Sequence, residues 1–373
     1  MPIETTAAVL RAFGRPLSIE AVTLRDPGPG EVLVRMVAAG VCHSDVGQAD
    51  GEWAFPLPAV LGHEGAAVIE ALGPGVSGLE PGQAVVLSSA PGCGVCPHCV
   101  AARPIRCQKA LGAMTDGELV TGSSPLQGAG GSIAAYSLLA CFAGHAVVAA
   151  RSAVPLPPDV PAEIAALIGC AVLTGFGAAV ETLDVAAGTR GAVIGLGGVG
   201  MSALQAALVS GAAVTGFDPR VQRRDRAEAL GACAAIDPSS DVVDDLVNSA
   251  PDEGFDWSIV TVGNASAMRR GIDLTRPGGR IAVVGLMPEN MLVPVDFLHL
   301  VTYEKAILGS AYGSLSPEIL IPRIVNLYLR GALPLGELVS ARFRFDQIND
   351  AFAASREARG VRAVLEISGG GNF

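Results

Sequence analysis

Two groups of residues have types and spacings that suit a metal ion. The first is a short lobe, at about residues 92–108, in which four cysteines follow a C-x2-C-x2-C-x7-C pattern: Cys93, Cys96, Cys99 and Cys107. Four thiolates this close together can surround a tetrahedral zinc ion and leave no open position, as in a structural site. An iron–sulfur cluster is the chemical alternative, and the spacing allows both. His98 lies inside the lobe, and we expect it at the surface.

The second group begins in the stretch GVCHSDVGQ, where Cys42 precedes a histidine, a serine and an aspartate. A cysteine can equally be an ordinary buried apolar residue, so this stretch alone leaves the role of Cys42 open. Other potential ligands are His63 and Glu64 in LGHEG, and Cys170 in LIGC. They lie far apart in the chain, so spacing alone does not join them into one site.

A glycine-rich motif predicts a dinucleotide cofactor. Gly195, Gly197 and Gly200 follow the G-x-G-x-x-G pattern, after an apolar run and before a helical stretch. The first permits a tight turn, the second lets a pyrophosphate approach, and the third allows close packing of helix and strand. The helix N-terminus offers partial positive charge to the phosphates. Asp218 ends the next apolar run, where a carboxylate can bind the ribose hydroxyls and repel a 2′-phosphate. We therefore expect NAD rather than NADP.

The elements around these motifs predict two domains. The first 150 residues hold short apolar runs cut by Gly and Pro, which is typical of an irregular, mostly-β domain. Later runs such as GAVIGL, AAVTGFD, FDWSIVTVG and RIAVVGL alternate with helical stretches, which indicates βαβ units. The pattern of apolar residues predicts a helix in SPEILIPRIVNLYLRGAL and a last strand in VRAVLEI. We expect an α/β protein with a doubly wound, Rossmann-type parallel sheet, divided into a mostly-β domain (1–168), a dinucleotide-binding domain (169–314) and a final segment (315–373).

Composition excludes some classes of protein. The chain has 373 residues, half of them hydrophobic and 16% charged, which allows a large buried core. A net charge of −11 argues against nucleic acid as a partner. Residues 191–217 carry no charge and are long enough to span a membrane, but clustered glycines and strand-like ends favour buried strands with a crossover helix. The N-terminus does not resemble a secretory signal. We expect a cytoplasmic protein that binds no membrane.

The motifs together resemble a known family. GVCHSD, LGHEG, the four-cysteine lobe, GC before TG, and GLGGVG occur in the same order, at similar separations, in the zinc-dependent alcohol dehydrogenases of the medium-chain dehydrogenase/reductase family. The resemblance covers essentially the whole chain and is greatest to the longer, typically dimeric branch. It implies that residues 1–168 form a GroES-like catalytic domain to which residues 315–373 return. It also implies a homodimer and two zinc ions per chain. The catalytic zinc would be held by Cys42, His63 and Cys170, and the structural zinc by the four-cysteine lobe.

The resemblance also implies roles for neighbouring residues. Glu64 matches a carboxylate that can approach the zinc, and Asp45 one that orients the ligand histidine. Ser44 matches the hydroxyl that binds the substrate oxygen and begins a proton relay, and His43 a position beside the cofactor pyrophosphate. The full set of implied cofactor contacts is His43, Thr174, Gly195, Gly197, Gly198, Val199, Gly200, Asp218, Arg223, Val262 and Arg362. The implied substrate pocket consists of Ser44, Trp53, Ser89, Tyr136 and Leu286.

The implied reaction is the reversible oxidation of a primary or secondary alcohol, medium-chain or aromatic, to an aldehyde or ketone. Hydride passes to NAD from an alcohol ionised at the zinc. Many relatives carry a relay histidine where this chain has Gly47, so we expect the proton to leave Ser44 through the cofactor ribose or by way of His43. Glutathione-dependent formaldehyde dehydrogenases carry an arginine near the position of Leu111, which disfavours a glutathione adduct. The alternatives are dehydrogenation of another thiol adduct, reduction of a carbonyl or imine, and a binding protein without turnover.

Overall fold

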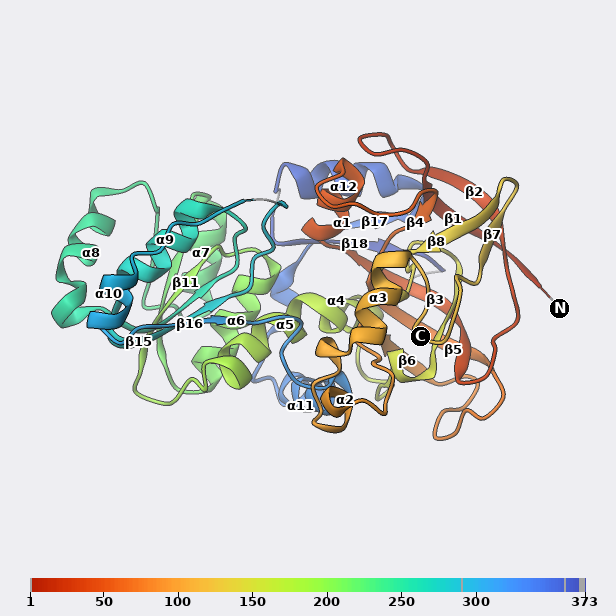
Figure 1. Ribbon diagram of the computed structural model, residues 1–373, viewed down its shortest axis with the longest axis horizontal. Helices are drawn as coiled ribbons and strands as arrows, with labels where there is room; N and C mark the ends of the chain where they lie inside the picture. Colours follow the sequence, from red (N-terminus) through yellow and green to blue (C-terminus); the bar gives the residue numbers. More distant parts are fainter. Residues whose placement is uncertain (1, 290, 359, 369–372) are drawn as a thin grey trace. The chain divides into compact units, whose positions relative to one another are not determined.

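The structure, a computed structural model, describes residues 2–289, 291–358, 360–368 and 373, and its chain divides into two compact units (Figure 1). Unit 1 comprises Met1–Ala171, Leu315–Arg330 and Leu335–Phe373, and unit 2 comprises Val172–Ser314 and Gly331–Pro334. Residues 169–171 thus lie with unit 1, although the sequence-based boundary put them in the second domain. The reason is local: a Cβ on Gly169 would lie 2.6 Å from the Leu87 carbonyl oxygen, so this part of the chain packs closely on a strand of unit 1.

Unit 1 is built from a closed barrel and a seven-stranded sheet. The barrel follows the order β1-β2-β7-β8-β4, and the sheet the order β10-β6-β5-β3-β18-β17 with β9 paired to β3. The barrel strands are β1 (Ile3–Leu10), β2 (Ser18–Leu24), β4 (Ala59–Val60), β7 (Leu126–Gly128) and β8 (Gly131–Ala135). The sheet strands are β3 (Glu31–Val41), β5 (Glu64–Leu72), β6 (Ala84–Leu87), β9 (His145–Ala149), β10 (Ala153–Pro155), β17 (Val339–Arg344) and β18 (Arg362–Glu366).

Short helices connect and cover these strands (Figure 1). The α-helices of unit 1 are α1 (His43–Asp50), α2 (Pro97–Val100), α3 (Gln108–Asp116), α4 (Ala162–Leu167), α11 (Pro317–Leu329) and α12 (Ile348–Arg356). The 3-10 helices are η1 (Pro104–Arg106), η2 (Tyr136–Leu138), η3 (Ala150–Ser152), η6 (Leu335–Leu338) and η7 (Phe345–Gln347), and η4 (Ile168–Val172) is a π-helical turn. A core of buried aliphatic side chains and Phe142 fills the unit, and Phe352 of α12 packs edge-on against Phe142.

Unit 2 is a parallel six-stranded sheet in the order β13-β12-β11-β14-β15-β16. The strands are β11 (Arg190–Ile194), β12 (Ala213–Phe217), β13 (Ala234–Ile236), β14 (Phe255–Val260), β15 (Thr275–Val283) and β16 (Ala306–Gly309). The helices are α5 (Leu173–Gly177), the π-helical η5 (Ala178–Thr182), α6 (Gly198–Val209), α7 (Val221–Ala229), α8 (Asp241–Glu253), α9 (Ala265–Leu274) and α10 (Phe297–Thr302). Helices that follow the strands pack against the sheet (Figure 1).

This architecture confirms the α/β class, with a GroES-like barrel unit and a Rossmann-type sheet. The uncharged segment 191–217 forms most of β11, then α6 and β12, as expected for buried parallel strands joined by a crossover helix. Among the described residues, one helix, Ala162–Thr182, is long and apolar enough to cross a membrane, but 89% of its apolar window is buried inside the molecule. Burial of this kind is typical of a core helix in a soluble fold.

Candidate metal centre and cofactor site

Four potential ligands from three parts of unit 1 lie together in its interior. The ligand atoms of Cys42, His63, Glu64 and Cys170 all lie within 4.8 Å of one another, and all four residues are buried. Zinc prefers thiolate and imidazole ligands, so two sulfurs and one nitrogen, with a carboxylate beside them, suit a zinc ion. The spacing in the sequence did not join these residues, but the fold does.

The antiparallel pairing of β3 and β5 explains part of this arrangement. Gly40 near the end of β3 lies opposite Glu64 at the start of β5. Cys42, which follows β3, and His63, which precedes β5, therefore lie at the same end of the sheet. Cys42 is then the N-cap residue of α1. Cys170 reaches the same place from the π-helical η4, and a π-helical turn is common where a helix presents a functional side chain.

Asp45 fixes the orientation of His63. Its Oδ1 lies 3.0 Å from His63 Nδ1 and accepts a hydrogen bond from the Gly62 N–H, and its Oδ2 accepts one from the Cys42 N–H. An ionised carboxylate can only accept, so Nδ1 carries the proton and Nε2 keeps its lone pair for a metal. Burial opposes the charged imidazole, but Asp45 and Cys42 raise the pKa of His63 well above its usual value.

The thiols of Cys42 and Cys170 lie in the same buried cluster, but their pKa values shift in opposite directions. A hydrogen bond from Cys170 lowers the pKa of Cys42 well below its usual value, and burial, which opposes this, is outweighed when Arg362 and His63 add their charges. The same hydrogen bond, together with burial, raises the pKa of Cys170. The pair therefore holds one thiolate readily and a second with difficulty, and a bound cation is what allows both thiols to ionise.

Glu64 and Arg362 form a buried pair beside the ligands. Arg362 Nη2 lies 3.4 Å from Glu64 Oε1, and Arg362 Nη1 donates to the Val41 carbonyl. Neither Glu64 oxygen has a hydrogen-bond partner among the described residues, and burial raises the pKa of Glu64 to about 7 despite the arginine. A Cβ on Gly40 would lie 2.0 Å from Glu64 Oε2, so glycine is required there. Neither the close approach at Gly40 nor the Glu64–Arg362 pair was predicted from the sequence.

The other implied residues of unit 1 lie at various distances from the ligands. Ser44 Oγ is 3.4 Å from His63 Nε2, and the Tyr136 ring meets the His63 ring edge-on with 5.8 Å between centroids. The Tyr136 hydroxyl lies 3.5 Å from the Ser44 carbonyl oxygen. Ser89, two residues after β6, is buried, whereas His43 is exposed at the start of α1. Trp53 lies over Gly47, and Leu286 belongs to unit 2, where it is 67% exposed.

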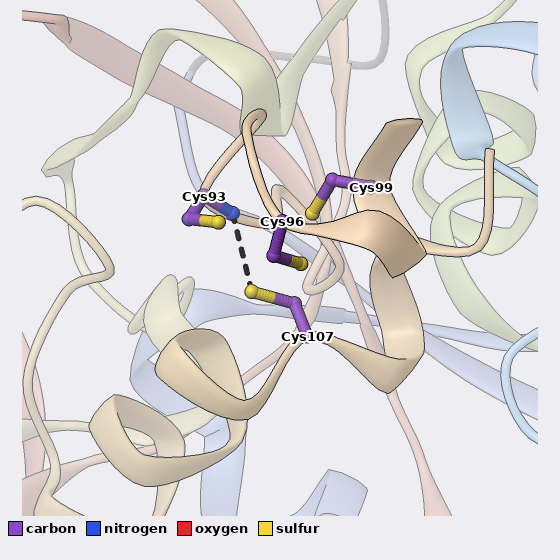
Figure 2. Close-up of side chains that lie close together, drawn as sticks. All are labelled: Cys93, Cys96, Cys99 and Cys107. Atoms are coloured by element: carbon purple, nitrogen blue, oxygen red, sulfur yellow. Dashed lines mark hydrogen bonds between the residues drawn. The ribbon is translucent and has the colours of Figure 1, made fainter. Parts of the chain in front are cut away.

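The four-cysteine lobe forms a second cluster of ligand atoms. Figure 2 shows the sulfurs of Cys93, Cys96, Cys99 and Cys107 directed toward one another, and their ligand atoms lie within 4.8 Å. The Cys93 N–H donates to Cys107 Sγ over 3.3 Å. Backbone N–H groups of Val95 and Cys96 lower the pKa of Cys93 to about 6, which favours a thiolate. His98 is exposed and outside the cluster. Four thiols without an open position suit a structural metal.

The glycine loop of unit 2 has the shape that its motif predicts. Gly195 has φ +92°, and a Cβ on Gly200 would lie 1.8 Å from the Gly195 carbonyl oxygen, so side chains are excluded at both positions. Gly197 is different, because a Cβ there would meet only Arg223 Nη1, at 3.8 Å. Gly197 therefore borders open space at the N-terminus of α6, where a pyrophosphate fits. Gly198 and Val199 begin that helix.

Asp218 already has several partners in unit 2. Its oxygens accept hydrogen bonds from the N–H groups of Leu196 and Arg220, and Arg223 Nη1 lies 3.4 Å away. These contacts hold the carboxylate beside the glycine loop.

Thr174 is on α5, and the neighbouring Gly175 packs closely against the Val199 carbonyl. Val262 Cγ2 would lie 2.3 Å from a Cβ on Gly195. Thr261, which the sequence analysis missed, donates to the Gly195 carbonyl oxygen. These contacts show which side chains support the loop from within unit 2.

Comparisons with known proteins agree with this description. Residues 28–158 match the alcohol dehydrogenase GroES-like domain, and residues 198–326 match the zinc-binding dehydrogenase domain. The chain is 37% identical to a geraniol dehydrogenase from Castellaniella defragrans, over 97% of this chain and 98% of that protein. It is 34% identical to an NDMA-dependent alcohol dehydrogenase from Amycolatopsis methanolica, over 97% and 99% of the two chains.

Solved structures show the same fold. Benzyl alcohol dehydrogenase from Acinetobacter calcoaceticus is 34% identical, with a TM-score of 0.92 over 98% of this chain and all of that one. Two structures at 25% identity hold a nicotinamide cofactor: an acetophenone reductase from Geotrichum candidum with NAD, and a zinc-binding dehydrogenase from Sinorhizobium meliloti with NADP. The chain is a zinc alcohol dehydrogenase and belongs to the medium-chain dehydrogenase/reductase family.

Proposed function

We propose that this alcohol dehydrogenase uses NAD to oxidise primary or secondary alcohols, medium-chain or aromatic, to aldehydes or ketones. The observation that carries the proposal is the buried cluster of Cys42, His63 and Cys170, whose ligand atoms lie within 4.8 Å of one another. Two relatives are named for geraniol and benzyl alcohol, which supports a medium-chain or aromatic substrate. Cys42, His63 and Cys170 would hold a zinc ion, which would supply a Lewis acid that favours ionisation of an alcohol, and a bound NAD would supply the hydride acceptor.

The side chains of unit 1 then have separate tasks. Cys42, His63 and Cys170 hold the zinc, and Asp45 keeps the proton of His63 on Nδ1 so that Nε2 can serve as a ligand. Ser44 Oγ lies beside His63 and accepts the substrate proton. Burial of this cluster excludes water, which strengthens each electrostatic contact.

The pocket and the proton exit are further parts of the proposal. Trp53, Ser89 and Tyr136 of unit 1 form walls around the substrate, and the small Ser89 leaves room for a ring or chain. The proton leaves Ser44 through the cofactor ribose or by way of His43. A His43→Ala variant tests the second route by its solvent isotope effect and pH profile, and an unchanged profile removes His43 from the relay.

Cofactor, assembly and location complete the proposal. Unit 2 binds NAD along Gly195–Gly200, with Asp218 toward the ribose hydroxyls and Arg223 beside it. Thr174, Val199 and Val262 of unit 2 contact the nicotinamide half. The four-cysteine lobe holds a structural zinc. The protein is a cytoplasmic homodimer, which equilibrium sedimentation and fractionation can check.

The test of the proposed function is an activity screen. Zinc-loaded enzyme is given NAD or NADP with geraniol, benzyl alcohol and a series of shorter alcohols, with and without a chelator. We expect NADH to form with the longer alcohols, and a chelator to abolish its formation. The proposal is contradicted if no alcohol reduces NAD although zinc and cofactor are bound.

A further inference from the structure

The chain after α1 folds back over that helix and brings a carboxylate to it. Helix α1 ends at Gly51, whose φ of +85° is the left-handed conformation that glycine favours at a helix end. The Glu52 N–H then donates to the Gly47 carbonyl over 2.9 Å, and Gln48 Nε2 donates to the Trp53 carbonyl over 2.9 Å. These bonds fix Glu52 and Trp53 against the helix.

The space that a side chain at position 47 would need is already filled. A Cβ on Gly47 would lie 2.7 Å from Glu52 Oε2 and 2.8 Å from Trp53 Cζ3. The carboxylate of Glu52 therefore lies where the first atom of that side chain would be. Glycine at position 47 is what allows this approach.

The direction of that Cβ shows which face of α1 the carboxylate covers. Cα–Cβ bonds in a helix tilt toward its N-terminus, and residues three or four apart share a face. From Gly47 this direction leads to Ser44 and His43, which begin the helix. Because the Glu52 carboxylate packs at Gly47, it lies on the face of α1 that residues 44 and 43 share with residue 47. Glu52 is exposed, so its carboxylate also reaches solvent.

Alcohol oxidation must release a proton from this site. The C–H and O–H bonds of the alcohol break, the hydride carries two electrons to NAD, a C=O bond forms, and one proton remains. Ser44 is half-buried between His63 and the Tyr136 hydroxyl, so a group nearer to solvent must take this proton.

We propose that Glu52, which packs against Gly47, is the proton acceptor that links Ser44 to solvent through His43 or water. This inference rests on the proposed function. The Glu52 carboxylate gains the proton that leaves the alcohol, and then loses it to water or buffer. Glu52 thus performs the proton transfer that Gly47, which has no side chain, cannot perform.

The test compares Glu52→Gln with the wild type and with Glu80→Gln, which alters an exposed loop carboxylate of the same unit. Two measurements are made on the zinc-loaded enzyme: steady-state oxidation of benzyl alcohol, and the rate of proton release when trifluoroethanol, which is not turned over, binds the enzyme–NAD complex. Each is made at low buffer and with added HEPES, a base that binds zinc only weakly. Metal analysis and NAD titration establish that the variants bind both cofactors as the wild type does.

We expect Glu52→Gln to slow proton release and turnover by about a hundredfold at low buffer, the lower end of what a positioned proton-transfer group contributes. Added HEPES should restore both rates, Glu52→Asp should keep part of them, and Glu80→Gln should match the wild type. An unchanged rate in Glu52→Gln, or a loss that HEPES does not restore, overturns the inference while the proposed function stands. A wild type that oxidises no alcohol contradicts both.

Discussion

The carboxylate of Asp45 and the imidazole of His63 face each other across 3.0 Å, between Asp45 Oδ1 and His63 Nδ1, in the interior of unit 1. The same carboxylate accepts hydrogen bonds from the N–H groups of Cys42 and Gly62. Asp45 therefore contacts both His63 and the backbone on either side of the cluster, at Cys42 and Gly62. All of its partners in these contacts are donors.

Replacement of Asp45 by Asn should weaken zinc binding at the buried site. The amide NH2 group cannot accept, so it would face an N–H donor in place of one carboxylate oxygen. Loss of such a contact to a ligand histidine typically costs 10- to 100-fold in metal affinity, and we expect about that change in competition with a chelator. Asp50→Asn, on the same helix but in an exposed pair with Arg356, is the control. Equal zinc affinity in both variants would contradict the assigned role.

A Gly197→Ala variant should separate cofactor binding from stability. Its Cβ would meet only Arg223 Nη1 at 3.8 Å, and its φ of −75° suits alanine, so the fold should be unaffected. The methyl group would occupy the space that we assign to the pyrophosphate. We expect an NAD dissociation constant at least about tenfold higher, by fluorescence titration, with an unchanged urea midpoint. Wild-type NAD affinity would place the pyrophosphate elsewhere.

The four-cysteine lobe should hold one of two zinc ions. Cys107 is buried and accepts a hydrogen bond from the Cys93 N–H, so Cys107→Ser removes a central ligand. We expect one zinc per chain instead of two, with a lower urea midpoint because a structural metal contributes to folding. Cys233→Ser changes an exposed cysteine outside both clusters and should keep two zinc ions. Iron in place of zinc, or an undiminished zinc content in Cys107→Ser, would contradict this assignment.

Glu31 should make stability depend on pH. Burial favours its protonated form, but hydrogen bonds from Arg25, Thr121 and the Gly28 N–H lower the pKa of Glu31 in the folded protein. This contribution is present above the pKa of the unfolded chain, about 4.3, and is lost as the pH falls through the lower folded value.

Glu31→Gln should therefore reduce the free energy of unfolding by about 1–3 kcal/mol at neutral pH, and by less as the pH falls below about 4. Urea denaturation of wild type and variant across this range measures the difference. Glu80→Gln, at an exposed position, should differ little from the wild type at any pH. A difference for Glu31→Gln that does not change with pH would show that the charge of Glu31 is not responsible.

The sequence indicated the α/β fold because its signals are local. The apolar runs at β11, β12, β14 and β15 are long enough to recognise, whereas β13 and β16, with sequences AAI and AILG, are too short to stand out. The four-cysteine lobe is also local, so its spacing alone suggested a metal. The uncharged segment 191–217 was correctly read as strands around a helix.

The buried cluster depends on tertiary structure. Cys42, His63 and Cys170 come from separate elements, and only the resemblance to a family joined them before the pairing of β3 with β5 was known. The sequence also gave no signal for the room that Gly40 leaves beside Glu64, or for Glu52 over Gly47. Each of these is a close approach between parts of the chain that no periodicity reveals.

The zinc content and activity of His63→Ala test most directly whether the buried cluster is the catalytic zinc site. We expect one zinc per chain, held by the four-cysteine lobe, wild-type NAD affinity in unit 2, and no oxidation of benzyl alcohol or geraniol. Metal analysis, NAD titration and NADH formation on a single preparation give all three values. A His63→Ala protein that keeps two zinc ions, or oxidises alcohols at the wild-type rate, would contradict the assignment of this site.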